Sequence, residues 1–152
     1  MALSFNEQHA MSLLTPHLGP NERVLYRSRG VEKPWYSRLF SRLGSLFWRN
    51  YLVAATDRRV LFVQHAGLLG GYKMKAVDAL AWHEVDRAQL GWGIFNKNLS
   101  VKSQARGFDK TVVLGRFWMK DNFPAAEAMV QTWSQSRTAL PGGSAGALPQ
   151  GI

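Results

Sequence analysis

The sequence predicts a mainly β domain with helices, in which about seven short strands form a barrel or a two-sheet sandwich capped by a C-terminal helix. Three observations predict this class. Residues 51–63 have the pattern of a tight hairpin, further strand-like runs follow at short and regular spacing up to residue 117, and an apolar stripe of helical period lies beyond residue 121. The 152 residues suffice for one domain with a substantial core.

The predicted central hairpin consists of two runs rich in β-branched and aromatic residues, Tyr51–Ala55 and Val60–Val63. Asp57 is expected to form the turn, because a short Asp side chain can bond the backbone two residues on, and Thr56 is expected to lie in water beside it. Alternation gives two largely apolar faces, Tyr51, Val53 and Ala55 on one and Leu52, Ala54 and Thr56 on the other. We therefore expect this hairpin to be central and covered on both sides.

The elements before the hairpin are a short helix and a strand. Residues 4–18 have helical periodicity, with Met11, Leu14 and Leu18 on one stripe. Residues 22–31 alternate as the first strand.

Four more strands are predicted after the hairpin, over residues 76–85, 88–95, 99–104 and 111–117. Residues 96–98 and 105–109 are predicted turns. Gly91-Trp92-Gly93 interrupts one strand and indicates a bulge or a close approach of strands.

A C-terminal helix is predicted from Asp121-Asn122, which form its cap, with Pro124 in its first turn. Its apolar stripe is expected to pack on the core and consists of Phe123, Ala126, Met129, Val130 and Trp133. The predicted organisation is an N-terminal helix in residues 1–20, a domain over 21–134 with an insertion at 34–50, and a disordered tail over 135–152, rich in Gly, Pro and Ser after residue 140.

The insertion at residues 34–50 has the composition of an amphipathic helix. On a helical projection seven apolar residues form one arc, with Arg38, Arg42 and Arg49 along its border and no acidic residue. A basic, aromatic-rich helix of this kind is typical of an interfacial membrane segment. Amphipathic helices also pack on their own core or on a partner, and Gly44 weakens the helix, so these alternatives and a non-helical loop stay open.

The hairpin run Tyr-Leu-Val-Ala-x-Thr-Asp-x-Arg-Val-Leu-Phe-Val, followed by a loop with Gly67, Gly70 and Gly71, resembles the bacterial pleckstrin-homology-like domains and, more loosely, their GRAM-domain relatives. The similarity covers roughly residues 22–133. It implies a PH-like barrel whose terminal helix plugs one end. Members of that superfamily bind lipids, peptides or copies of themselves.

The resemblance also implies where an anion would bind. In lipid-binding members the headgroup lies at the open end of the barrel, beside the loop joining the first two strands, the Gly-rich loop and a later loop. The residues that would converge there are Lys33, Arg38, Arg42, Arg49, Lys73, Lys75, Arg106 and Lys110. No compact Lys-x-Arg headgroup signature lies between the first two strands, which argues against specific phosphoinositide recognition.

The charge favours an anionic partner. The formal net charge is +9, and residues 22–59 hold nine basic and three acidic residues. There is no cysteine, hence no disulfide scaffold or thiolate zinc site. The four histidines, His9, His17, His65 and His83, show no metal-ligand spacing. We expect neither a cofactor nor a bound metal, and no enzymatic activity.

Two functions are predicted from different classes. The first is a peripheral membrane module in which the basic open end and the 35–49 segment dock on anionic lipid; the second is a protein-interaction or self-assembly module that uses the same segment or a strand edge. Nucleic-acid binding is not favoured. The predicted location is cytoplasmic, on the inner face of the membrane in the first case. The predicted contact residues are Trp35, Tyr36, Leu39, Phe40, Leu43 and Phe47.

Overall fold

A computed structural model of the chain describes residues 7–33, 39, 48–66, 73–119 and 121–139. The described strands form one seven-stranded antiparallel sheet of order β4-β3-β2-β1-β7-β6-β5. The strands are β1 (Val24–Glu32), β2 (Arg49–Thr56), β3 (Arg59–His65), β4 (Met74–Ala81), β5 (Arg87–Leu90), β6 (Asn96–Ser103) and β7 (Phe108–Gly115). The helices are α1 (Glu7–Leu14), α2 (Asn122–Ala139) and the short 3-10 helices η1 (Thr15–His17) and η4 (Trp82–Glu84).

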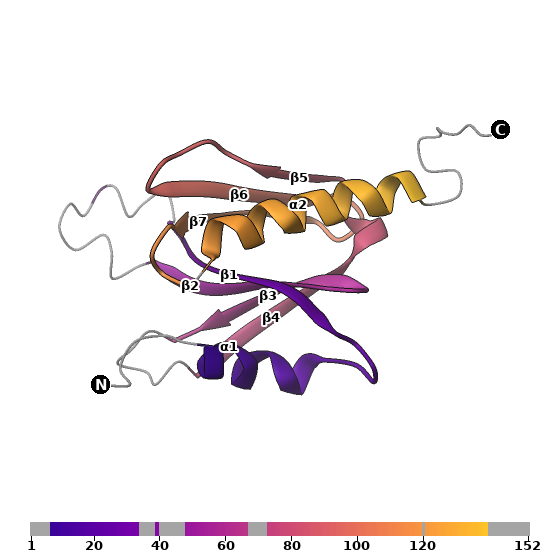
Figure 1. Cartoon of the computed structure of the whole chain (residues 1–152), viewed down its shortest axis with the longest axis horizontal. Helices are drawn as coiled ribbons and strands as arrows, with labels where there is room; N and C mark the ends of the chain where they lie inside the picture. The colour runs from indigo at the N-terminus through magenta and orange to yellow at the C-terminus, as the bar shows by residue number, and fades with distance from the viewer. Residues whose placement is uncertain (1–6, 34–38, 40–47, 67–72, 120, 140–152) are drawn as a thin grey trace.

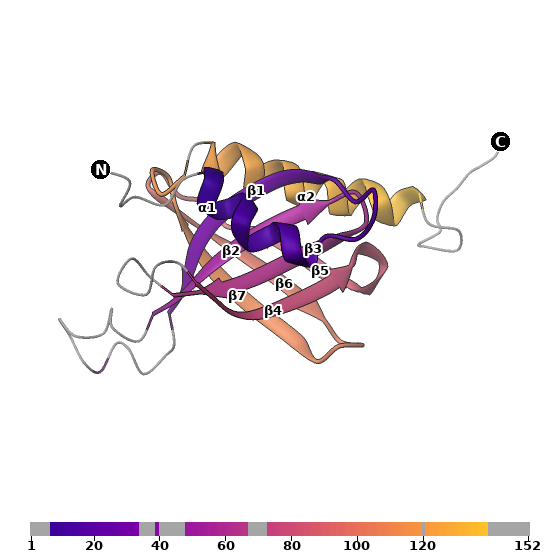
Figure 2. The ribbon, with the colours of Figure 1, turned by 90° about the horizontal axis from the view of Figure 1, so that it is seen from below.

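The sheet bends sharply where β1 meets β7. These strands pair only at Gly30 with Leu114 and at Val31 with Val113, so the sheet separates into a four-stranded half and a three-stranded half that face each other. In Figures 1 and 2, α2 lies along the three-stranded half and α1 covers the outer face of the four-stranded half. No pairing joins β4 to β5 in the part of the chain that is described, so the sheet is not closed into a barrel. The mainly β class with a C-terminal helix is confirmed.

Both faces of the β2–β3 hairpin are buried, as the alternation predicts. Tyr51, Val53 and Ala55 point into the core between the two halves of the sheet and α2. Leu52 and Ala54 point the other way, into a second apolar cluster under α1. In α1 the buried residues are Ala10, Leu13 and Leu14, whereas the predicted stripe residue Met11 is only half-buried and Leu18 lies beyond the helix.

The turn of the hairpin is formed by Thr56 and not by Asp57. The Thr56 hydroxyl accepts hydrogen bonds from the backbone N–H groups of Arg58 (3.1 Å) and Arg59 (3.0 Å), and its side chain is buried. Asp57 instead pairs with Arg23: its carboxylate accepts from the Arg23 N–H at 3.2 Å, and its own N–H donates to the Arg23 carbonyl at 3.1 Å. The prediction that Thr56 lies in water is therefore wrong. A Thr hydroxyl can accept the same backbone hydrogen bonds in a turn that an Asp carboxylate accepts, and here Thr56 does so.

Glu22 fastens the segment before β1 to this turn. Its buried carboxylate accepts from the Arg59 guanidinium at 2.9 Å through both oxygens, from the Thr56 hydroxyl at 2.7 Å and from the Gly19 N–H at 2.7 Å. The hydrogen bond from Arg59 lowers the pKa of Glu22 from 4.5 to about 2, and the pKa of Arg59 is raised in return. The cluster holds α1 and η1 against the four-stranded half.

The helix α2 begins at Asn122 and packs Phe123, Ala126 and Met129 into the main core, with Val130 and Trp133 at its margin. The predicted apolar stripe is confirmed. The helix continues to Ala139, so residues 135–139, predicted to belong to a disordered tail, are helical. Gln135, Arg137 and Ala139 favour a helix, so helix propensity continues past Trp133, where the apolar stripe that set the predicted boundary ends.

Several strand boundaries differ from the predicted ones. Residues 96–98, predicted as a turn, open β6 because Asn96 pairs with Gly115 and Asn98 with Val113. Residues 82–84 form η4 and do not continue β4. Arg49 and Asn50, predicted in the insertion, belong to β2, where they pair with Glu32 and Val31 of β1.

Candidate functional site

The ends of four strands meet at one end of the molecule, on the left in Figures 1 and 2. Glu32 at the end of β1 pairs with Arg49 at the start of β2, and His65 at the end of β3 pairs with Met74 at the start of β4. Four of the predicted anion-binding residues, Lys33, Arg49, Lys73 and Lys75, belong to this end. We call it the basic end, defined by these four residues.

Three lysines of the basic end are exposed and have no carboxylate partner among the described residues. Lys73 and Lys75 flank Met74 at the start of β4, where the Lys73 carbonyl accepts a hydrogen bond from the Ala66 N–H at 2.7 Å. The Lys33 ammonium lies 4.3 Å from the centre of the Trp48 ring. These lysines are therefore available to an anionic surface.

Arg49 and Lys110 are instead partly neutralised around Glu32. The Glu32 carboxylate lies 3.6 Å from the Arg49 guanidinium and 4.0 Å from the Lys110 ammonium, and it accepts a hydrogen bond from the Tyr51 hydroxyl at 3.4 Å. The Lys110 ammonium donates to the Tyr51 hydroxyl at 2.6 Å and lies 3.8 Å from Asp78. The Lys110 side chain is only 13% exposed, so its charge is balanced within the protein and is little available to a ligand.

Arg106 lies away from the basic end, although the resemblance placed it there. Its guanidinium donates to Glu84 in η4 at 3.3 Å and to the carbonyl of Ala79 at 3.4 Å. Ala79 is four residues along β4 from Lys75, which corresponds to roughly 13 Å at the rise of a β-strand. Arg106 thus bridges the β6–β7 turn to the edge of β4, and it does not converge with the lysines.

The remaining predicted contacts lie mostly outside the described residues. Arg38 and Arg42, together with Trp35, Tyr36, Phe40, Leu43 and Phe47, belong to the undescribed part of the insertion. Leu39 is described and is 72% exposed. The amphipathic character of the segment therefore stays a prediction.

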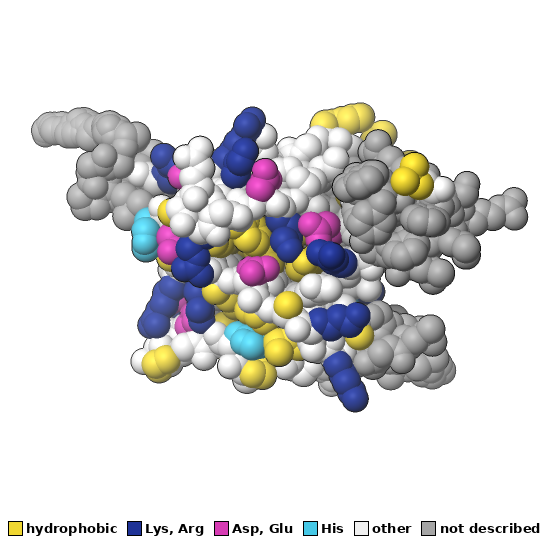
Figure 3. All heavy atoms as spheres, turned by 180° about the vertical axis from the view of Figure 1, so that it is seen from behind, with side chains coloured by type: hydrophobic (Ala, Val, Ile, Leu, Met, Phe, Trp, Pro, Cys, Tyr) yellow, Lys and Arg dark blue, Asp and Glu magenta, His cyan; other side chains and the backbone are white. Residues whose placement is uncertain are grey.

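The face opposite α2 is of mixed charge. Figure 3 shows Lys and Arg side chains interleaved with Asp and Glu around a strip of hydrophobic side chains on this face. Ion pairs among the described residues, such as Lys102 with Asp109 (3.6 Å) and Arg106 with Glu84 (3.3 Å), likewise combine the two charges. This face is therefore not uniformly basic.

Sequence reasoning missed a group of exposed apolar side chains on two neighbouring loops. Trp92 (88% exposed), Ile94 and Phe95 lie between β5 and β6, and Phe117 (81% exposed) lies between β7 and α2. The pattern offered a signal, since Gly-Trp-Gly-Ile-Phe does not alternate and so does not fit a half-buried strand. The sequence predicts a bulge or a close approach of strands at Gly91-Trp92-Gly93. β5 ends at Leu90, and Gly93 lies in close backbone contact with Asn96, but the pattern did not indicate that the neighbouring apolar side chains are exposed.

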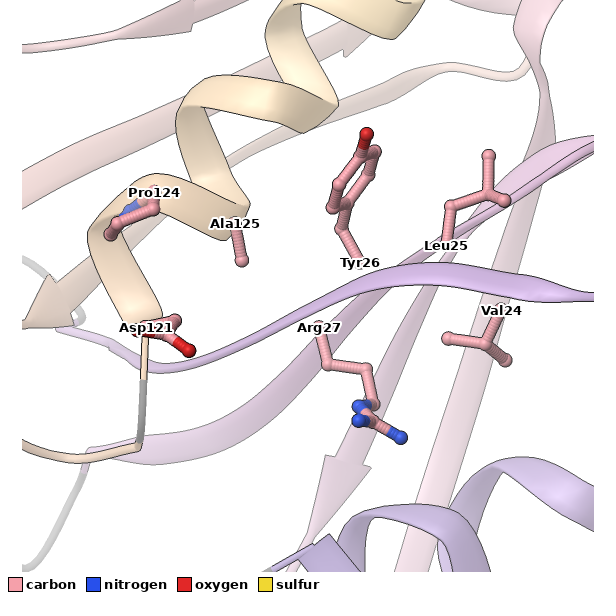
Figure 4. A pocket seen from close by; sticks show the side chains of 7 residues that line it. All are labelled: Val24, Leu25, Tyr26, Arg27, Asp121, Pro124 and Ala125. Atoms are coloured by element: carbon pink, nitrogen blue, oxygen red, sulfur yellow. The ribbon is translucent and has the colours of Figure 1, made fainter.

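A groove of about 360 Å³ lies between β1 and the first turn of α2. Figure 4 shows the Tyr26 ring pointing toward α2, whereas the Arg27 side chain points away toward α1, where it lies 2.9 Å from the Met11 sulfur. Asp121 and Pro124 form the wall at the helix N-terminus. With a carboxylate in the wall and the guanidinium turned away, this groove is a poor site for an anion.

No group of three His, Asp or Glu side chains gathers as metal ligands among the described residues. The Nδ1–H of the buried His65 donates to the Ala66 carbonyl at 2.7 Å, because a carbonyl oxygen can only accept. Burial lowers the pKa of His65 below 6.5. No helix in the described part of the chain is long and apolar enough to span a membrane.

Comparisons with known proteins support the fold. A pleckstrin homology domain from Shewanella amazonensis SB2B superposes with a TM-score of 0.51 at 16% identity, over 82% of this chain and 95% of that one. The hSac2 domain from the human phosphoinositide phosphatase Sac2 superposes with a TM-score of 0.51 at 12% identity, over 88% of this chain and 85% of that one. A search of curated proteins gave no significant match.

The sequence itself matches a family model. The model is that of the bacterial PH domain, and the match covers residues 18–132, which include every strand of the sheet and most of α2. The resemblance seen in the hairpin is thereby confirmed. The match extends over most of the chain and agrees with the strand order and the terminal helix, and the chain accordingly belongs to the bacterial PH domain family.

Proposed function

We propose that this domain is a non-enzymatic recruitment module that docks on anionic membrane surfaces through its basic end. The observation that carries the proposal is the position of Lys33, Lys73 and Lys75. They are exposed at the same end of the four-stranded half, Lys33 after β1 and the other two at the start of β4, and they have no carboxylate partner among the described residues. Basic residues near an anionic leaflet contribute about 1 kcal/mol each, so three lysines give a moderate and salt-sensitive attraction.

The insertion at 34–50 supports docking with the basic end toward the membrane. It leaves the sheet between Lys33 and Arg49, at the basic end, and its sequence combines aromatic residues with Arg38 and Arg42. If it lies on the bilayer, its rings sit at the headgroup boundary while the arginines contact phosphates. The lysines then act as the electrostatic part of one docking surface.

Co-sedimentation with liposomes tests the proposal. The protein is mixed with neutral vesicles or with vesicles containing phosphatidylserine, at low and at physiological salt. A Lys73→Glu/Lys75→Glu variant is expected to bind anionic vesicles about 30-fold or more weakly, since two contributions of about 1 kcal/mol are lost. Failure of the wild type to bind anionic vesicles even at low salt contradicts the proposal.

A charge-matched control separates docking from net charge. Arg87 and Lys102 form an exposed cross-strand pair of β5 and β6 that lies away from the basic end. Arg87→Glu/Lys102→Glu changes the net charge by the same amount as Lys73→Glu/Lys75→Glu. Because it leaves the basic end intact, we expect it to weaken binding far less. Equal losses in both variants would indicate attraction by net charge alone.

The groove beside β1 favours a second candidate function, namely binding of a protein segment. β1 pairs with β7 only at Gly30 and Val31, so the strand edge before Gly30 faces α2 without a strand partner among the described residues. The exposed Leu25 and Tyr26 line this groove. Sedimentation velocity on the wild type and on Tyr26→Ala tests self-association here: a monomer at all concentrations argues against another copy as the occupant.

A further inference from the structure

An exposed apolar group lies on the β5–β6 and β7–α2 loops, and two of its residues, Ile94 and Phe117, border a hollow of about 500 Å³. Its members are Trp92, Ile94, Phe95 and Phe117, which are 88%, 55%, 68% and 81% exposed. We call these four residues the aromatic tip. A group of large apolar side chains with this much exposed surface usually marks a site that contacts a membrane or another molecule.

Backbone contacts hold the two loops of the aromatic tip together. The Arg116 N–H donates to the Phe95 carbonyl at 2.9 Å, which ties the β7–α2 loop to the β5–β6 loop. The Gly91 N–H donates to the Asn98 carbonyl at 2.8 Å. A side chain on Gly93 would overlap the carbonyl oxygen of Asn96, so this turn requires glycine. The tip is therefore presented by a fixed backbone.

Basic groups accompany the aromatic tip. The Arg116 guanidinium lies 5.8 Å from the centre of the Phe117 ring, and the Lys97 ammonium lies 5.1 Å from the Phe123 ring. Lys97 also pairs with Glu127 at 2.6 Å, and Asp121 is the other acidic residue that lines the hollow beside Ile94 and Phe117. An arginine beside the exposed Phe117 ring is a combination suited to the boundary between lipid headgroups and acyl chains.

The aromatic tip lies at the same end of the molecule as the basic end. In both Figure 1 and Figure 2 the β5–β6 loop and the β7–α2 loop are on the left, where β1 and β3 also end. A bilayer that contacts Lys33 and Lys73 therefore also faces the loops of the tip. Trp92 and Phe117 are 88% and 81% exposed, so their rings are accessible to the interfacial layer of that bilayer.

We propose that the aromatic tip inserts into the interfacial layer of the bilayer on which the basic end docks. This inference rests on the proposed membrane function and adds to it a second, hydrophobic contact outside the 34–50 insertion. The lysines supply attraction that salt screens, and the tip supplies attraction that salt does not weaken. Membrane binding of the domain thus has two separable components.

The test measures binding to phosphatidylcholine–phosphatidylserine vesicles at physiological salt and at about 0.5 M salt, where surface attraction is largely screened. Trp92→Ala/Phe117→Ala is expected to lose the salt-resistant part of the binding by tenfold or more and to retain attraction at low salt. His83→Ala is the control, because His83 is also exposed but lies in η4, which Arg106 joins to the β6–β7 turn at the opposite end of β6 from the tip. It is expected to bind as the wild type does.

A second measurement does not depend on the folding of the alanine variant. Vesicles with brominated acyl chains are expected to quench part of the tryptophan fluorescence of the wild type, and the conservative Trp92→Phe variant is expected to lose that part. Unchanged quenching in Trp92→Phe, together with wild-type binding by Trp92→Ala/Phe117→Ala, would overturn the inference while the docking of the lysines stands.

Two further outcomes also decide the question. If the wild type binds no anionic vesicle at any salt concentration, the proposed function and this inference fail together. If Trp92→Ala/Phe117→Ala instead converts a dimer into a monomer in sedimentation velocity, the aromatic tip is a self-association surface and the inference is overturned.

Discussion

The side chain of Asn122 takes the place of a strand partner for Arg29. Its Oδ1 accepts the Arg29 N–H at 2.7 Å, and its Nδ2 donates to the Arg29 carbonyl at 2.8 Å. Nδ2 also donates to the carbonyl of Gly115 at 2.7 Å, and the Asn122 carbonyl accepts from the Ser28 hydroxyl at 2.9 Å. One residue at the start of α2 thereby fills the gap that opens where β7 leaves β1.

Asn122→Ala is expected to destabilise the fold by about 2 to 4 kcal/mol, because it leaves several backbone groups near Arg29 and Gly115 without a partner. Urea denaturation measures this. Asn122→Asp is expected to fold poorly as well, since its second oxygen faces the Arg29 carbonyl where Nδ2 now donates. Gln131→Ala, on the exposed side of α2, is the control with little expected change. A loss below about 1 kcal/mol in Asn122→Ala contradicts this role.

Acid is expected to weaken the fold through Glu22. Its pKa is lowered to about 2 in the folded state from 4.5, mainly by the hydrogen bond from Arg59. The folded state therefore holds this proton less tightly than the unfolded state, so the stabilisation is complete above about pH 4.5 and is lost as the pH falls toward 2. The difference corresponds to about 3 kcal/mol. Urea denaturation between pH 6 and pH 3 measures it, and Glu22→Gln should remove most of the dependence.

His65 is expected to add a pH dependence at milder acidity. Burial lowers its pKa below 6.5, and the positive charge of Arg29 acts in the same direction. The unfolded chain thus takes up the proton first, so stability is full above about pH 6.5 and decreases as the pH falls below it. A ring titration by NMR should give a midpoint for His65 below 6.5. A midpoint at or above 6.5 would show that the ring is solvated in the folded protein.

Gly30 is expected to tolerate no side chain. It pairs with Leu114 where the sheet bends, and a Cβ there would lie 2.6 Å from the carbonyl oxygen of Val113 and 2.7 Å from the Leu114 side chain. Gly30→Ala is expected to cost about 1 to 3 kcal/mol or more, since the two strands must move apart. Gly91→Ala is the matched control, because its Cβ would meet no atom closer than 3.6 Å. Thermal unfolding of both variants makes the comparison.

Periodicity predicted the elements whose burial follows from local pattern. The two faces of the β2–β3 hairpin and the stripe of α2 were predicted residue by residue, because alternation and helical spacing decide which side chains can be covered. The turn residue was assigned wrongly because Thr56 and Asp57 both suit a turn. Which of them forms it depends on Arg23, which lies 34 positions away from Asp57.

The candidate site could be predicted only in part, because convergence of charges depends on the bend of the sheet. Lys73 and Lys75 lie at the basic end, whereas Arg106 lies beside Glu84. Sequence alone does not reveal that Lys110 has two carboxylates within 4.0 Å. The aromatic tip was missed because exposed Trp and Phe side chains contradict the rule that large apolar residues are buried.

The bond between Asn122 and Arg29 joins residues 93 positions apart, whereas the β2–β3 turn joins strands separated by two residues. Closing a short loop costs far less chain entropy than closing a long one. The order of folding events follows: the hairpin can form early and guide the neighbouring strands, and α2 completes the bent sheet late. Substitutions at Asn122 should therefore speed unfolding with little effect on the folding rate, whereas substitutions at the hairpin turn should slow folding.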